Sequence, residues 1–263
     1  MSVGAPPRAG RGRGALLVAV VVALLALMTG WSAAGVGFAP GELLRNLGSL
    51  RRIVGDSFPP DWAFWRRLLA PFLETLQIAV VGSVLGGLIS LPLAILAARG
   101  VAPTPAVAWV HRQAMNLLRT MPDLFWAMLF ASAVGFGPFA GALALTVFTV
   151  AVVSKLLSES AESIDFALTE TVRAGGGGWS STVRFAVLPQ ILPQYVSFVL
   201  YAFEINVRAS TVLGLVGAGG IGMVLNTQRT TFQYQRVTLI VLAIFGVVVL
   251  LEQLSEAARR RLV

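Results

Sequence analysis

Long, predominantly apolar stretches recur along this sequence, and they constrain its fold more than any other feature. A helix of about 20 such residues crosses a hydrocarbon layer about 30 Å thick. In lipid the backbone must satisfy its own hydrogen bonds, so the α-helix is the spanning form open to stretches of this length. Six of them are predicted to span a membrane: residues 15–36, 76–98, 115–134, 139–153, 194–216 and 237–251.

The composition excludes a water-soluble domain. Of the 263 residues, 56% are apolar and 12% are charged, whereas about 25% are charged in an average soluble protein. The chain has no cysteine and a single histidine, His111, so it offers no disulfide framework, no thiolate ligand and little material for a metal centre. The net charge of +8 is typical of arginines beside membrane spans. We therefore expect the lipid bilayer as a partner, no nucleic acid and no metal ion.

The distribution of basic residues predicts the orientation of the chain. With the N-terminus inside, 12 of the 20 Lys and Arg residues fall on the inner side and 8 on the outer side, and inner loops carry the excess in most membrane proteins. The sequence thus predicts a cytoplasmic tail at residues 1–14 and a basic cytoplasmic tail at residues 256–263. Residues 15–36 follow a basic start, so a removable secretory signal peptide is their alternative interpretation.

The region between the first two spans mixes leucines with arginines and tryptophans. Its leucine spacing predicts an amphipathic helix at the periplasmic membrane surface, and a plain surface connection is the alternative. We assign residues 15–72 to the first span and this connection. Residues 73–255 form the predicted core of five helices.

The connection between the fourth and fifth spans, residues 154–192, is the longest inner one, and it alternates polar with apolar positions at helical spacing. The run Gly175–Gly178 is expected to end a first helix and to permit a sharp reversal of the chain. A second helical stretch, residues 180–187, then leads to Pro189 and Pro193. This helix–turn–helix element suits docking to a partner protein.

Four residues of this connection have the spacing of a known loop. The EAA loop of ABC-importer permeases reads E-A-A, three residues, G, nine residues, I-x-L-P, and Glu170, Gly176, Leu188 and Pro189 occupy its positions. The two alanines and the isoleucine of that loop are replaced in this chain, by Thr171, Val172 and Ala186.

The stretches that follow resemble one branch of these permeases. Residues 188–194, 201–208 and 211–222 are similar to the phosphonate-uptake permeases of the PhnE type. Residues 119–122, Arg-Thr-Met-Pro, resemble the entry to their third span. The resemblance covers roughly residues 74–255.

This resemblance implies an all-α fold, that of the transmembrane subunit of a type I ABC importer, with a cytoplasmic coupling helix, in the inner membrane. In the family, two identical or related permease subunits form the pathway, and two ATPase subunits dock on their coupling loops. A periplasmic or lipid-anchored binding protein of the phosphonate type would deliver the cargo. That cargo would be phosphonate or a related oxyanion, phosphite or phosphate, with another small solute such as methionine as the alternative.

The resemblance also assigns roles within the chain. ATP and Mg²⁺ belong to the partner ATPase, since this chain has no G-x-x-x-x-G-K-[ST] sequence, and we expect no catalytic residue and no bound cofactor in it. The ATPase-coupling role carries over to a set of loop residues: Glu170, Ala174, Gly175, Gly176, Gly177, Gly178, Leu188 and Pro189.

Three polar residues, Glu204, Asn206 and Arg208, interrupt the apolar fifth span. A charge at the bilayer centre costs at least roughly 2.5–3.5 kcal/mol, so such residues face a partner or a wet cavity. Glu204 and Arg208 are four residues apart on one helical face and can form a structural ion pair. The alternative is that the three residues line the translocation pathway, where Arg208 could bind an oxyanion in a bidentate manner.

Kinks and glycines suggest candidate gates or hinges. The set is Pro92, Arg119, Pro122, Gly217, Gly219 and Gly220. Residues 217–222 also match G-x-G-x-x-G, but a dinucleotide site requires a preceding strand in a βαβ unit, and no strand is expected here.

Two further classes of protein are alternatives to an ABC permease. An intramembrane serine protease needs a base beside its nucleophile, and His111 occurs without a G-x-S-x-G sequence. An ion-coupled secondary transporter could relay protons through Glu74 and Glu204, but the chain shows no detectable inverted repeat and the coupling loop would have no role.

Overall fold

The computed structural model describes residues 11–260, and each element in this range is helical. Five helical stretches are long and apolar enough to cross a membrane, or six if the bent pair α5–α6 is one span. The predicted all-α class with about six spans is therefore confirmed. Arg8 in the predicted tail 1–14, and residues 261–263 of the predicted tail 256–263, lie outside the described residues.

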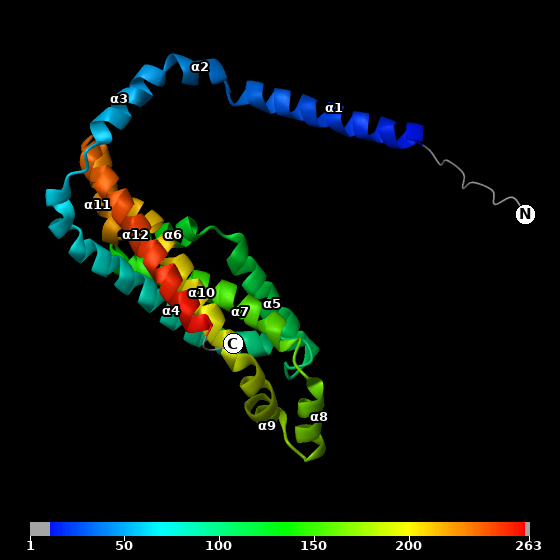
Figure 1. Cartoon of the computed structure of the whole chain (residues 1–263). Coiled ribbons are helices and arrows are strands. Elements are labelled where there is room, and N and C mark those ends of the chain that lie inside the picture. The colour runs from blue at the N-terminus through cyan, green and yellow to red at the C-terminus, as the bar shows by residue number, and fades with distance from the viewer. Residues whose placement is uncertain (1–10, 261–263) are drawn as a thin grey trace, which may run out of the picture. The chain divides into compact units, whose positions relative to one another are not determined.

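The chain divides into two compact units, residues 1–55 and 56–263 (Figure 1). The first contains α1 (Arg11–Gly35), α2 (Pro40–Arg45) and most of α3 (Leu47–Ser57). Leucines and valines are exposed all around α1, as expected of a helix whose solvent is lipid. In α3 the apolar Leu47, Leu50 and Val54 follow a spacing of three and four residues, the pattern of an amphipathic helix.

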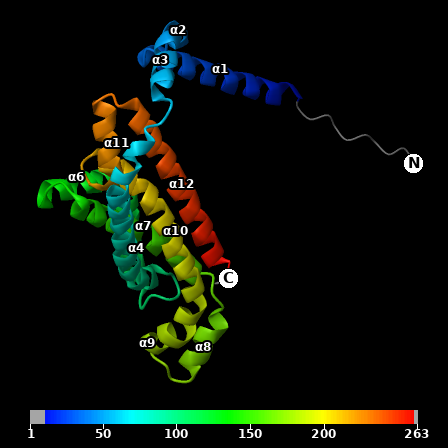
Figure 2. The same ribbon diagram turned by 60° about the vertical axis from the view of Figure 1, so that its left-hand side comes forward.

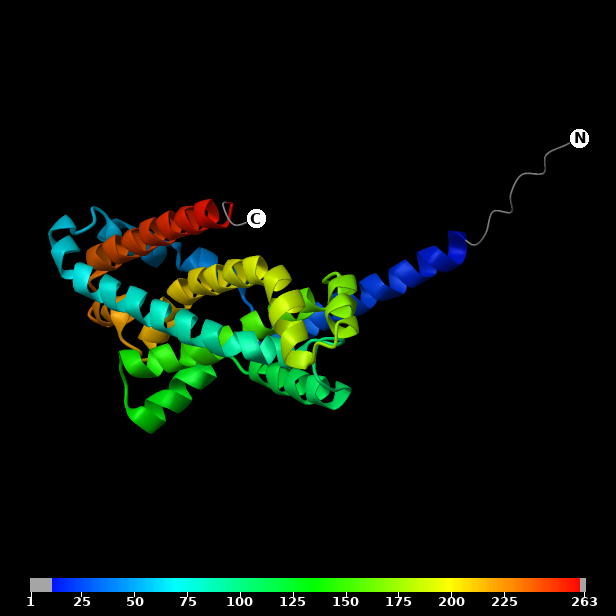
Figure 3. The same ribbon diagram turned by 90° about the horizontal axis from the view of Figure 1, so that it is seen from below.

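Three helices form the centre of the second unit: α4 (Leu69–Ala97), α7 (Pro138–Ala161) and α10 (Leu188–Leu215). Small residues allow α4 and α7 to approach closely, because a Cβ atom at Gly82 would lie 2.6 Å from the Cβ of Leu145. Leu213 of α10 joins Leu145 in a buried apolar cluster. Figure 3 shows α12 (Tyr234–Arg259) on one side of this centre and α5 (Pro105–Thr120) and α6 (Asp123–Val134) on the other.

The predicted third span, residues 115–134, is not one straight helix. It is broken between α5 and α6, whose axes differ by 88°. The physical cause is Pro122, since a residue before proline is driven out of the helical conformation, and Met121 is extended, with φ −91° and ψ 131°. Pro122 is thus confirmed as a bend. By contrast, α4 continues through Pro92 to Ala97.

The second unit begins before the predicted boundary at residue 73. The short 3₁₀ helix η1 (Trp62–Arg67) packs against the start of α12, where Phe64 and Leu68 are buried with Leu239 and Ile240. An ion pair of 3.1 Å between Asp61 and Arg236 reinforces this contact. Phe64 and Leu68 before α4 therefore belong to the helical core, whereas Trp62 and Trp65 are exposed.

The predicted coupling loop, residues 154–192, also has different limits. Residues up to Ala161 continue α7, and residues from Leu188 belong to α10. Between them lie α8 (Phe166–Ala174), α9 (Trp179–Thr182) and the π-helical turn η2 (Val183–Val187). We call residues 162–187 the coupling segment. In Figure 2 its α8–α9 tip projects beyond one end of the bundle, opposite to α11 (Gly220–Thr230).

Candidate coupling and transport site

The tip of the coupling segment is built by a glycine-specific helix end. The N–H of Gly176 donates to Arg173 O and the N–H of Gly177 donates to Val172 O, both at 2.9 Å. This pair of bonds is a Schellman motif, which requires a left-handed residue at the position of Gly176, and Gly176 has φ +82°. Six of the predicted ATPase-coupling residues lie in α8 or in the turn that follows it, on the tip of the segment: Glu170, Ala174, Gly175, Gly176, Gly177 and Gly178.

The other end of α8 is fixed to α10. The carboxylate of Asp165 accepts from the N–H of Ala167 at 2.9 Å and caps the helix. Gln190 in the first turn of α10 accepts from the N–H of Asp165 at 3.0 Å. The predicted coupling residues Leu188 and Pro189 therefore lie at the base of α10, away from the tip, with Leu188 packed against the buried apolar cluster around Ile191.

The coupling segment is also attached to the loop between α4 and α5. The indole N–H of Trp179 donates to Val101 O at 2.7 Å. A Cβ atom on Gly100, which has φ +81°, would lie 3.2 Å from the ring of Phe166. The coupling segment thus contacts the α4–α5 loop as well as α10.

Asn206 lies inside the bundle. Its side chain is fully buried and its amide donates to Ser83 Oγ of α4 and to Thr149 Oγ1 of α7, each at 2.8 Å. The Asn206 amide therefore joins the three central helices α4, α7 and α10. Sequence spacing gave no sign of these partners, which are 123 and 57 residues away.

Glu204 does not form the predicted pair with Arg208. Its carboxylate is 2.8 Å from the guanidinium of Arg259 near the end of α12, although the orientation of the two groups does not make a hydrogen bond. Arg208 is exposed and has no ion pair among residues 11–260. The cavity between Glu204, Arg208 and Glu252 is only about 10 Å³, roughly the minimum that one water molecule needs.

The glycine-rich loop between α10 and α11 packs against the start of α4. Gly217, Gly219 and Gly220 have φ of +92°, +81° and +68°, conformations that favour glycine. The N–H of Gly220 donates to Glu74 Oε2 at 3.1 Å, so the carboxylate of Glu74 lies at the N-terminus of α11. Since no strand precedes the loop in the described chain, its geometry is that of a tight helix–helix turn.

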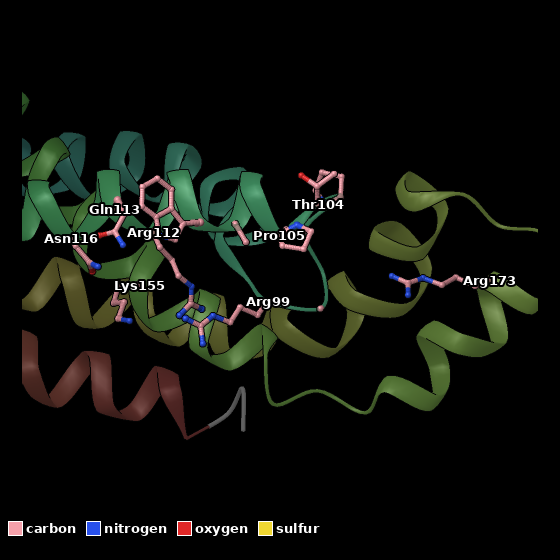
Figure 4. A pocket seen from close by; sticks show the side chains of 13 residues that line it. Arg99, Thr104, Pro105, Arg112, Gln113, Asn116, Lys155 and Arg173 are labelled. Atoms are coloured by element: carbon pink, nitrogen blue, oxygen red, sulfur yellow. The ribbon is translucent and has the colours of Figure 1, made fainter.

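Sequence reasoning did not find a basic cavity of about 680 Å³ beside the coupling segment. Its wall includes Arg99, Arg112, Lys155 and Arg173, which come from the α4–α5 loop, α5, α7 and α8 (Figure 4). The predicted gate residue Arg119 lies elsewhere, exposed in the last turn of α5. The sequence alone relates these basic residues to the orientation of the chain and not to a cavity.

Comparisons with known proteins identify the family of this chain. Residues 90–263 match the model of one protein family. This family is described as "Binding-protein-dependent transport system inner membrane component". The chain belongs to this family. The permease is 39% identical over 218 residues to the phosphite transport system permease protein PtxC of Stutzerimonas stutzeri, covering 83% of this chain and 79% of that protein. It is 40% identical over 218 residues to the phosphate-import permease protein PhnE of Mycolicibacterium smegmatis, covering 83% of this chain and 40% of that protein.

The fold of the permease is shared with a solved transporter. A chain of the methionine ABC transporter MetNI, in an inward-facing conformation, superimposes with a TM-score of 0.68, covering 77% of this chain and 99% of that one at 21% identity. The family match and the permease relatives show that the protein is a multi-pass membrane subunit of an ABC importer and not an enzyme. Its family implies ATPase and binding-protein partners and a second permease subunit.

Proposed function

We propose that this permease carries phosphite, phosphonate or phosphate across the inner membrane as part of an ATP-driven importer. The observation that carries the proposal is the 39% identity over 218 residues to a phosphite permease. The relatives at 40% and 42% identity are named for phosphate import and for phosphonate transport. Methionine is a weaker candidate, because the likeness to the methionine transporter, at 21% identity, concerns the fold alone.

In this proposal, two ATPase subunits dock on the α8–α9 tips of two permease subunits, which are identical or related chains. ATP and Mg²⁺ bind to the ATPases, and this chain binds no cofactor. The exposed tip and its attachments through Trp179 and Gln190 support the role, because a docking element must pass its displacement to the spanning helices.

The proposed orientation has the coupling segment and both termini in the cytoplasm. A periplasmic or lipid-anchored binding protein then meets the opposite end of the bundle, where the glycine-rich loop and α11 lie. The excess of basic residues on the inner side supports this orientation.

For the translocation pathway, we propose that Arg208 binds the oxyanion. We also propose that the helix break at Pro122 and the loop with Gly217, Gly219 and Gly220 act as hinges or gates. The exposed guanidinium of Arg208 is free to bind a partner or cargo. Arg119 and Pro122 adjoin the 88° bend between α5 and α6, which supports this part of the proposal.

The test is uptake into proteoliposomes that contain the permease with its ATPases, supplied with loaded binding protein. We expect ATP-dependent accumulation of phosphite, phosphate or methylphosphonate, and none without the ATPases. Accumulation of methionine alone would exclude the oxyanion class. Uptake by the permease alone, driven by a proton gradient, would instead identify a secondary transporter.

A further inference from the structure

The basic cavity beside the coupling segment has more positive charge than the protein itself neutralises. Arg112 pairs with Glu162, and the same carboxylate oxygen accepts from the backbone N–H of Arg99 at 2.7 Å. Lys155 pairs with Glu159 at 2.8 Å. These contacts compensate two of the four cations that line the cavity.

The other two cations are uncompensated. The side chains of Arg99 and Arg173 are exposed and take part in no ion pair within the described part of the chain. Figure 4 shows the guanidinium groups of Arg99 and Arg112 close together and Arg173 directed toward them from α8. Like charges repel, so an arrangement that gathers them around one cavity of about 680 Å³ favours a bound anion.

The remaining wall suits an oxyanion. Thr104, Gln113 and Asn116 add neutral hydrogen-bond donors to the guanidinium groups, and guanidinium binds phosphate oxygens in a bidentate manner. Trp109, which is 63% exposed, lines the same cavity. Tryptophan beside arginine is typical of the headgroup level of a membrane.

We propose that this cavity binds a phosphate-type oxyanion, either the headgroup phosphate of an anionic phospholipid or free phosphate, held by Arg99, Arg112 and Arg173. Basic pockets between membrane helices bind such headgroups. Since Arg173 belongs to α8 and Arg99 to the α4–α5 loop, the bound anion joins the coupling segment to the bundle. It acts in parallel with the bond from Trp179 to Val101. The site is defined by its charges and does not depend on which cargo the permease carries.

The experiment uses the purified complex of permease and ATPases without binding protein, and it measures hydrogen–deuterium exchange of the amides in residues 166–174. One arm adds inorganic phosphate to the complex in a neutral detergent. The other arm uses buffer without inorganic phosphate and compares nanodiscs of the anionic lipid phosphatidylglycerol with nanodiscs of the zwitterionic lipid phosphatidylcholine. Slower exchange in either arm supports the site and identifies its source, and unchanged exchange in both arms overturns the proposal.

A variant with a matched control tests the residues. The measured quantity is the concentration of phosphate or phosphatidylglycerol at which the slowing of exchange reaches half of its maximum. The double variant Arg99→Gln/Arg173→Gln is expected to raise this concentration at least about tenfold, which corresponds to a loss of about 1.4 kcal/mol of binding free energy. The control Arg66→Gln/Arg229→Gln removes the same charge from exposed positions that do not line the cavity, and it should leave that concentration unchanged. An equal rise in both variants would mean nonspecific attraction and would overturn the proposal. If the cavity variant fails to assemble, the two arms on the parent complex still decide.

Discussion

Glu204, Asn206 and Arg208, which lie close together in α10, differ in burial. Asn206 and Glu204 are buried and have partners on other helices of the same chain. Arg208, on the same helix, is exposed and has no ion pair in the described range. The buried residues are thus explained by packing of the bundle, and the exposed one needs a partner outside it.

The substitution Asn206→Ala is expected to lower the free energy of unfolding by about 1–2 kcal/mol, because Ser83 and Thr149 lose their shared donor and a small cavity remains. The measurement is the midpoint of thermal unfolding of the purified permease in detergent. Asn46→Ala, at an exposed position that does not line the basic cavity, is the control and should leave the midpoint within error. A midpoint for Asn206→Ala equal to that of the control would contradict a structural role for the buried amide.

The substitution Arg208→Gln is expected to reduce ATP-dependent oxyanion uptake at least about tenfold, as the loss of one charged hydrogen bond of roughly 1.5–3 kcal/mol predicts. Uptake is measured in proteoliposomes, and co-purification of the ATPases shows that the complex is assembled. Arg208→Lys keeps the charge but loses the bidentate geometry, so its uptake should be intermediate. Unchanged uptake by Arg208→Gln in an assembled complex would remove this residue from the pathway.

At the scale of elements, the end of α8 is the most constrained part of the coupling segment. Gly176 is left-handed, whereas Gly178 has φ −74° and open space around the position of a Cβ atom. Gly176 therefore requires glycine and Gly178 does not, although both belong to one run of four glycines. The sequence of the run does not show this difference.

We expect Gly176→Ala to strain the turn by roughly 1–2 kcal/mol and to raise hydrogen exchange of the amides of Gly176 and Gly177. The stimulation of ATPase activity by loaded binding protein should fall with it. Gly178→Ala, the matched substitution in the same turn, should leave the exchange unchanged. Gly176→Asn, a residue that tolerates the left-handed region better, should lie between the two. Equal exchange in all three variants would show that the Schellman turn does not depend on glycine.

At the scale of the whole molecule, the orientation can be tested cleanly because the chain contains no cysteine. Ser180→Cys lies in the coupling segment and Thr231→Cys lies after α11, and both positions are exposed. In intact spheroplasts an impermeant maleimide is expected to label Thr231→Cys and not Ser180→Cys. Lysed membranes, in which both should react, are the control, and the reverse labelling pattern would invert the proposed topology.

The sequence also determined much at this scale. The lengths of the apolar runs predicted about six spans, and the spacing from Glu170 to Pro189 indicated the permease family, which the match over residues 90–263 confirms. These features are local, since hydropathy and motif spacing depend on residues near one another in the chain. The bend at Pro122 belongs with them, although its angle of 88° does not follow from the proline alone.

Only the tertiary structure decided which polar groups meet. The pair of Arg112 and Glu162 joins residues 50 positions apart, and the pair of Glu204 and Arg259 replaces the local one expected from helical spacing. The basic cavity likewise exists because four elements converge at one end of the bundle. Side-chain periodicity predicts which face of a helix is polar. The energy of a charge on that face depends on the groups that pack against it, and this packing exists only in the folded chain.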